Sequence, residues 1–274
     1  MRYLIFVLTL FSVSAYSQRP GGYFLDQQWW IGIRGGLNVT EAVPQTSVSA
    51  FSPINYDVEE TEKSYSSYDQ IGVWVGLEFT YSFKQFSVGF QPNFRRQSFS
   101  YSNSYSWQNA ETGASFFLNT DQGHDLDYLE LPLIFKYEYK IERWTPFVQF
   151  GGYYGYLLNA NKQVELNGLD EASGGQEEFI LESFSLGATS LFVRSSVGLL
   201  GGIGTHYSLG NIRLTFDITY RYGLNNIASV EDRFSDNRLA GIGDALDDIE
   251  LRNLAFSVGA LFPLRFLSSG YTAF

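Results

Sequence analysis

The sequence predicts an all-β fold, an eight-stranded antiparallel up-and-down transmembrane β-barrel, on three observations. Apolar and polar residues alternate along eight segments. Short connections between these segments take turns with long ones. Aromatic residues make up 18% of the chain and gather near the ends of the segments. A period of two is the pattern of a strand with one apolar face, because successive side chains point to opposite sides.

The clearest segment is 70–83, where every odd position from Ile71 to Phe83 is apolar. Seven further segments show the same alternation: 29–39, 86–95, 129–139, 148–158, 191–203, 212–222 and 253–262. Each is long enough to cross the hydrocarbon layer of a bilayer, for which a tilted strand needs ~9–11 residues. Pro132 lies inside one of them and lacks a backbone N–H, so we expect a bulge or an unpaired position there.

The connections have the layout of a membrane barrel. Short ones lie at 84–85, 142–145 and 208–210, and long ones at 40–69, 99–127, 159–190 and 224–249. Short turns at one end and long loops at the other are typical of transmembrane barrels. The apolar face is then expected to meet lipid and the polar face to line the interior. A soluble exported sandwich or lipocalin-like barrel is the alternative, but its long loops would not alternate so regularly.

Aromatic residues fall where bands at the two membrane surfaces would lie. At the turn end we expect Trp29, Tyr81, Phe83, Phe86, Tyr139, Trp144, Phe147 and Phe262. At the loop end we expect Phe94, Tyr128, Tyr156, Tyr220 and Tyr222.

The ends of the chain predict export to an outer membrane. Arg2, an apolar run over 4–13 and the small residues Ala15 and Ser17 have the layout of a secretory signal peptide. We therefore expect a signal peptide at 1–17, a lead at 18–27, one barrel domain at 28–264 and a tail at 265–274. With an even number of strands, both ends of the mature chain are expected in the periplasm.

Composition excludes several classes of function. The chain has no cysteine, which excludes disulfides, iron–sulfur clusters and thiolate zinc sites. Its net charge of −11 argues against a nucleic-acid partner, because phosphate binding needs a basic surface. No motif indicates a cofactor or a metal ion, and we expect neither.

Charged residues on the polar face are expected to point into the barrel. They are Arg34, Glu78, Arg95, Glu130, Lys136, Glu138, Arg194, Arg213, Asp217 and Arg221. An eight-stranded barrel leaves room inside only for side chains, and a buried charge needs a partner. These residues therefore predict a paired charge network that fills the interior and holds the strands in register. A narrow ion path and a proton relay are the alternatives.

The long connections carry most of the negative charge and one of the two histidines. Three of them, 40–69, 159–190 and 224–249 with the adjoining Glu250, have a net charge of −5 each. They are expected to be solvated, or to bind a basic partner or, through divalent ions, lipopolysaccharide. His124 is expected in the loop 99–127 between Asp121, Asp125 and Asp127, and an Asp–His pair at a barrel rim could serve catalysis. His206 is expected in the interior or at its rim.

Three stretches carry a resemblance to a known family. They are 31–38 (IGIRGGLN), 128–137 (YLELPLIFKY) and 253–259 (NLAFSVG). In these stretches and across the mature chain, the sequence resembles the PorT-like outer-membrane β-barrel family of the Bacteroidota. The resemblance implies an eight-stranded outer-membrane barrel, and the family's namesake takes part in type IX secretion.

These observations favour a non-enzymatic subunit of an outer-membrane machine, for type IX protein secretion or for barrel assembly. Its expected partners are outer-membrane lipid, lipopolysaccharide and other outer-membrane proteins, contacted through strands or loops. A stand-alone porin-like channel, a surface-binding barrel and an enzyme with His124 at its rim remain as alternatives.

Overall fold

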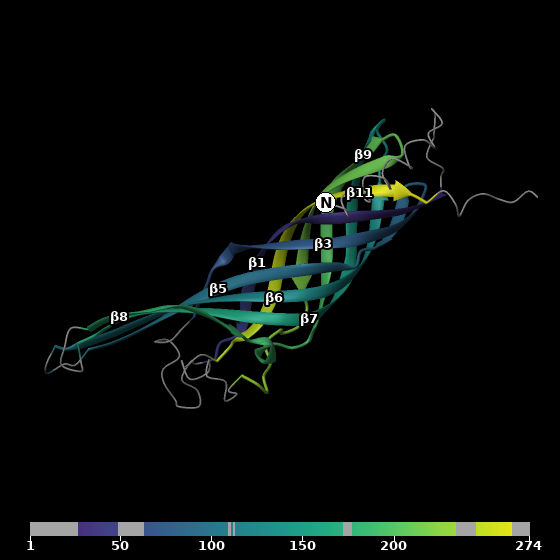
Figure 1. Ribbon diagram of the computed structural model, residues 1–274. Helices are drawn as coiled ribbons and strands as arrows, with labels where there is room; N and C mark the ends of the chain where they lie inside the picture. The colour runs from purple at the N-terminus through teal and green to yellow at the C-terminus, as the bar shows by residue number, and fades with distance from the viewer. Residues whose placement is uncertain are drawn as a thin grey trace, which may run out of the picture.

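A computed structural model describes residues 27–48, 63–108, 111, 113–171, 177–233 and 245–264. The predicted signal peptide, all but the last residue of the lead and the tail 265–274 lie outside the described residues. The described chain is almost entirely β-structure (Figure 1). No helix in this part of the chain is long and apolar enough to cross a membrane.

Eight antiparallel strands form a closed ring, if β4 and β5 are counted as one interrupted strand. In ring order they are β1 (Gln27–Thr46), β3 (Ser67–Phe83), β4 (Phe86–Phe90) with β5 (Asn93–Gln108), β6 (Ser115–Glu138), β7 (Trp144–Asp170), β9 (Ser195–Leu209), β10 (Ile212–Gly223) and β11 (Asp248–Pro263). The last strand returns to the first, where Trp30 lies opposite Pro263. The predicted fold class is confirmed.

Three short elements lie outside the ring. β2 (Ser64–Tyr65) pairs with β5, and β8 (Glu177–Gly187) pairs with β7. A 3₁₀ turn, η2 (Thr189–Leu191), precedes β9. Each of the three tight turns contains a residue with positive φ, at Lys84, Glu142 and Gly210. We call their side of the barrel the turn end and the opposite side the loop end.

The outer face of the ring is apolar, as the alternation predicts. Ile71, Val75 and Ile203 are each more than 60% exposed, and the outward side chains of the other strands are exposed in the same way. Two residues expected in the aromatic bands are buried instead, namely Tyr128 and Phe147. Both occupy inward positions of the alternation. The odd or even position of a residue along its strand therefore predicted its exposure better than its distance from the strand end did.

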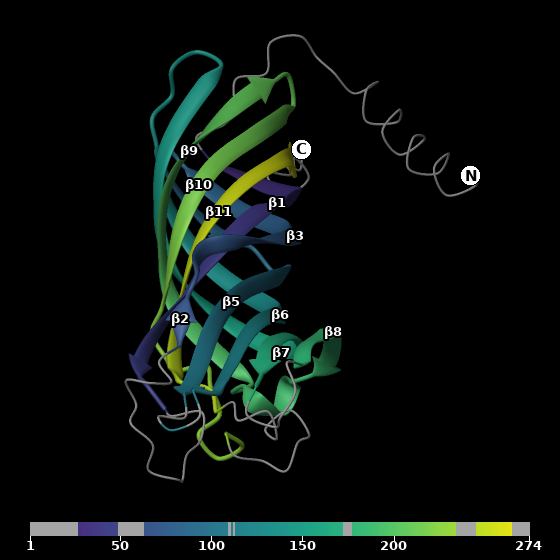
Figure 2. The same ribbon diagram turned by 90° about the vertical axis from the view of Figure 1, so that its left-hand side faces the viewer.

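The strands at the loop end are longer than predicted. Much of 99–127 and 159–190, expected as loops, is strand: β6 already begins at Ser115 and β7 runs to Asp170. β5, β6, β7 and β8 continue past the ring as a four-stranded protruding sheet (Figures 1 and 2). An apolar alternation did not reveal this sheet, because polar residues interrupt the apolar positions of β6 over 115–128.

The unpaired position expected at Pro132 is present on the side of β4 and β5, where Pro132 has no partner in the strand register. Pro132 keeps its register with β7, opposite Tyr153. On its other side the strand is interrupted between β4 and β5 at Gln91 and Pro92. The N–H of Gln91 still donates to the carbonyl of Pro132, at 3.0 Å. The missing donor is therefore accommodated by breaking the adjacent strand, without a bulge at Pro132 itself.

Candidate functional site: the barrel interior and the protruding sheet

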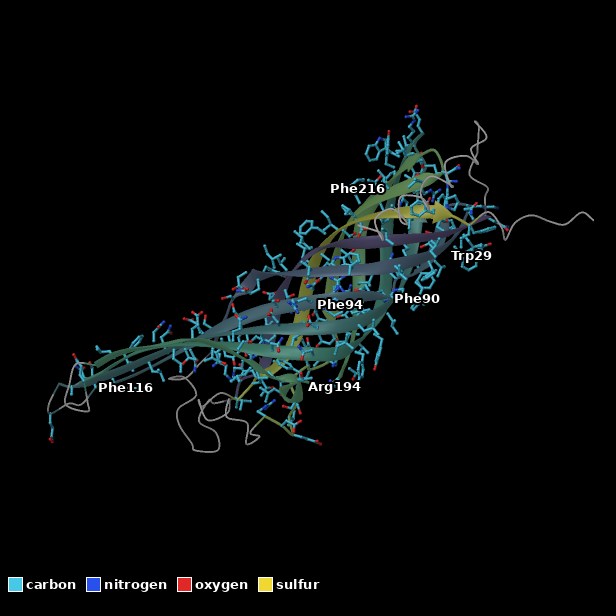
Figure 3. The ribbon with its side chains drawn as sticks, in the orientation of Figure 1. Trp29, Phe90, Phe94, Phe116, Arg194 and Phe216 are labelled. Atoms are coloured by element: carbon cyan, nitrogen blue, oxygen red, sulfur yellow. The ribbon has the colours of Figure 1, made fainter. Side chains whose placement is uncertain are left out.

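Nine of the ten predicted interior charges are buried in the barrel, and the tenth, Arg194, is not. Arg194 is exposed at the loop end, where its Nη1 donates to the carbonyl of Leu157 at 3.3 Å (Figure 3). The predicted strand 191–203 begins only at Ser195, because Leu191 and Phe192 are buried in the turn before it. Arg194 therefore lies before the strand, and its inward placement was wrong.

Glu78 on β3 is the centre of the first group of charges. Its Oε2 lies 3.2 Å from Nη1 of Arg34, and its Oε1 lies 2.7 Å from Nζ of Lys136. Arg34 also pairs with Asp217 on β10. All four side chains are at most 7% exposed. The group links β1, β3, β6 and β10 across the interior, and its two positive and two negative charges balance.

A second group lies nearer the turn end, around Glu138. Its Oε2 lies 3.5 Å from Nη1 of Arg213, and its Oε1 accepts a hydrogen bond from Ser87 at 2.6 Å. His206 lies in the interior, stacked on Phe147 at 4.5 Å, with its Nδ1 2.9 Å from the hydroxyl of Thr215. One positive and one negative charge again balance.

A third group consists of two arginines that share one carboxylate. Oε2 of Glu130 lies 2.9 Å from Nε of Arg95 and 2.7 Å from Nη2 of Arg221. Each guanidinium also lies over an aromatic ring, Arg95 over Trp74 at 4.8 Å and Arg221 over Tyr153 at 4.3 Å. This group carries one positive charge in excess.

An apolar cluster closes the interior at the loop end. It joins side chains of the strands to side chains of the connections: Ala42, Phe99, Tyr101, Leu126, Tyr128, Leu157, Ala160, Ala188, Leu191, Phe192, Ile227, Ala228, Leu246, Ile249 and Leu251. The segments 188–192, 227–228 and 246–249 thus fold inward over the charge network. Sequence reasoning missed this cluster, because most of its residues lie in the stretches 40–69, 99–127, 159–190 and 224–249, which were expected as connections.

His124 packs against this cluster and does not lie at an exposed rim. It lies on β6, is 1% exposed and stacks on Phe99 at 4.9 Å and on Tyr101 at 5.4 Å. Asp125 accepts a hydrogen bond from Ser98, and Asp127 pairs with Arg96 at 2.7 Å. The expectation of a loop histidine at the rim was wrong, because residues 115–128 form a strand and turn His124 inward.

Two distant connections are joined above the apolar cluster by Lys63. Its Nζ lies 2.9 Å from Oδ1 of Asp247 and donates to the carbonyls of Val48 and Ala245. The hydroxyl of Tyr65 donates to Oδ2 of the same aspartate at 2.8 Å. Lys63 and Asp247 were expected only as parts of acidic loops, and no local pattern marks them as partners.

Buried side chains fill the interior among the described residues and leave a small cavity between them. The cavity beside Arg34, Trp74 and Arg221 has a volume of about 20 Å³, which holds about one water molecule. Among the described residues, no cluster of three His, Asp or Glu side chains is placed to hold a metal ion.

The protruding sheet ends in an edge strand. β8 pairs with β7 on one side and is the last strand in the sheet order, so its other backbone edge has no strand beside it in the described structure. Phe116 lies close to the far tip of this sheet, and Trp29 lies at the turn end of the molecule (Figure 3). Parts of the acidic connections, 49–62 and 234–244, lie outside the described residues.

Comparisons with known proteins agree with this architecture. A family profile described as "Outer membrane protein beta-barrel domain" matches residues 16–229. This match supports the outer-membrane part of the sequence resemblance, and no comparison is specific to PorT-like proteins or to the Bacteroidota. A comparison with curated protein sequences gave no match.

Among solved structures, the chain is similar to outer membrane protein W of Escherichia coli, with 13% identity, a TM-score of 0.36 and coverage of 88% of this chain and 100% of that one. It is also similar to the outer membrane protease OmpT from Escherichia coli (10% identity, TM-score 0.35, coverage 89% and 99%). A third is Neisserial surface protein A (11% identity, TM-score 0.32, coverage 85% and 96%). Likenesses this distant carry no information about function.

Proposed function

The chain belongs to the outer membrane protein β-barrel domain family, and from this premise we propose that it is a non-enzymatic, non-conducting barrel that serves as an accessory subunit of an outer-membrane protein assembly. The barrel anchors the protruding sheet of β5, β6, β7 and β8 to the membrane, and the sheet binds a partner protein. The resemblance to PorT-like proteins favours an assembly for type IX secretion, with barrel assembly as the second choice.

The filled interior is the observation that carries this proposal. Arg34, Glu78, Lys136 and Asp217 bridge the barrel from β1 to β10, and the apolar cluster covers them at the loop end. A solute that crossed the interior would have to separate these buried ion pairs. The separated charges would have no water to replace their partners, so the separation is strongly unfavourable. The geometry therefore favours an anchor over a channel.

The open edge of β8 supports the docking of a partner. An edge strand presents a row of backbone N–H and C=O groups on which a strand of another protein can be added. β8 has the sequence EEFILESFSLG, which combines apolar residues with three glutamates. A partner strand with basic side chains fits this composition, because opposite charges across a strand pair attract.

Orientation is part of the proposal. The turn end, with both ends of the barrel, faces the periplasm, and the loop end with the protruding sheet faces outward, as in other barrels with this layout. The sheet then contacts partners or lipopolysaccharide outside the bilayer.

Purification of the tagged protein from native outer membranes in mild detergent, followed by native mass determination, tests the proposal. We expect a stoichiometric protein partner with the wild type. Ile180→Lys places a charge in β8 and blunts its edge, so the partner should be lost. Val230→Lys is the matched control, because Val230 is an exposed residue in another connection and its variant should keep the partner.

A single species of the mass of this chain alone would count against an assembly subunit and favour a stand-alone, surface-binding barrel. A partner retained equally by wild type and Ile180→Lys would keep the assembly but move the docking surface away from β8.

A further inference from the structure

A small cavity lies in the barrel interior, lined by side chains of β1, β3, β5, β6, β9, β10 and β11. Its volume is about 20 Å³, and the donors that line it include Arg34, Trp74, Gln91, Arg95 and Arg221. One carboxylate, that of Asp217, also lines it, and its oxygens already accept hydrogen bonds from Arg34, Gln149 and Thr219. This is room for a single particle of about the size of a water molecule, so a ligand here is one water molecule or one monatomic ion.

The charges around the cavity do not balance. Arg95 and Arg221 both pair with Glu130, which can neutralise only one of them. The remaining buried carboxylates of the network are already matched, since Glu78 and Asp217 face Arg34 and Lys136, and Glu138 faces Arg213. One positive charge in this network is therefore uncompensated, and it lies at the cavity.

The side chains that line the cavity also have donors to spare. Nη1 of Arg95, Nε of Arg221 and Nε of Arg34 are buried and have no hydrogen-bond acceptor among the described residues. The same holds for the indole N–H of Trp74 and the amide nitrogen of Gln91. These donors outnumber the unpartnered acceptor on the cavity wall, Oδ1 of Asn93. Buried polar groups are nearly always hydrogen-bonded. Several unpartnered N–H groups around one cavity therefore indicate a ligand that accepts hydrogen bonds.

We propose that this cavity binds a monovalent monatomic anion, chloride under ordinary conditions. A chloride ion accepts hydrogen bonds from several N–H groups at once and neutralises the excess charge of Arg95 and Arg221. Water would satisfy some donors but would leave that charge uncompensated. The bound anion joins β1, β3, β5 and β10 at the level where β4 and β5 are interrupted. This inference does not depend on the proposed function.

The test is a crystal structure of the protein refolded in sodium bromide, with diffraction data collected at the bromine absorption edge. Bromide takes the place of chloride and scatters anomalously, whereas water does not. We expect an anomalous peak in the cavity within hydrogen-bond distance of Arg95 and Arg221. Density in the cavity without an anomalous signal, or no density there, would overturn the proposal.

Two variants sharpen the result. Arg221→Gln removes the excess charge and should lose the bromide peak, while Arg213→Gln removes a buried arginine that does not line the cavity and should keep it. Stability gives a second readout that needs no crystal. Above the dissociation constant, each tenfold rise in chloride should raise the folding equilibrium constant of the wild type about tenfold, relative to gluconate at equal ionic strength. A wild-type protein whose stability is the same in chloride and gluconate contradicts the proposal.

Discussion

At the scale of single residues, the interior is organised by carboxylates that each serve more than one partner. Glu78 holds Arg34 and Lys136, and Glu130 holds Arg95 and Arg221. A buried ion pair adds little stability compared with apolar packing, but the loss of one partner leaves a charge that nothing neutralises. These carboxylates therefore act mainly by penalising any strand arrangement in which they would be separated from their partners.

Glu78→Gln should show this penalty directly. It leaves two buried cations with only Asp217 for compensation, so we expect a loss of about 3–5 kcal/mol in the free energy of unfolding. Urea unfolding in detergent micelles, followed by tryptophan fluorescence, measures it.

Glu41→Gln is the matched control for this substitution. Glu41 faces Arg252 at 3.9 Å in a partly exposed pair at the loop end, where the expected loss is about 1 kcal/mol or less. Equal losses in the two variants would contradict the account of the interior.

Whether these side chains point inward could be predicted from the sequence, but which residues they pair with could not. Alternation along a strand says which side chains point inward, which placed nine of the ten charges correctly. It failed at Arg194, which lies before the start of its strand. Contacts such as Lys63 with Asp247 join connections 184 residues apart, and no local pattern carries that information.

At the scale of elements, the seam between β1 and β11 closes the barrel and depends on close backbone contact. A side chain at Gly36 would collide with the carbonyl oxygen of Phe256 on β11. The two strands would have to move apart where the ring closes.

Gly36→Ala should therefore destabilise the closed barrel by about 1–3 kcal/mol, the usual cost of overpacking. The measurement is the fraction of refolded protein that migrates faster on a gel when unheated than when boiled. Gly123→Ala is the control, because the nearest atom to its added Cβ is 3.9 Å away. Closure would not depend on this contact if both variants refolded like the wild type.

Element boundaries were predictable inside the apolar belt and not beyond it. Between 70 and 83 the lipid-facing positions must be apolar, so the pattern is continuous. Between 115 and 128 the strand is hydrogen-bonded in the same way, but its outward residues are largely polar. The protruding sheet is therefore held by backbone hydrogen bonds between neighbouring strands. The apolar pattern of a single strand does not predict such pairing.

At the scale of the whole molecule, the two halves of the interior differ in how they are filled. Buried ion pairs fill the half toward the turn end, and the apolar cluster fills the half toward the loop end. The fold and the family show that the chain is an outer-membrane β-barrel protein. In our proposal, the filled interior distinguishes it from a channel.

Conductance of the purified barrel in planar lipid bilayers tests the central claim, that the interior is closed, most directly. Insertion is checked separately, by the gel shift of protein recovered from vesicles of the same lipid. We expect inserted wild-type protein to show no steady single-channel current above the leak of the lipid. Steady current steps at the nanosiemens scale from inserted protein would contradict the closed interior and make the barrel a channel.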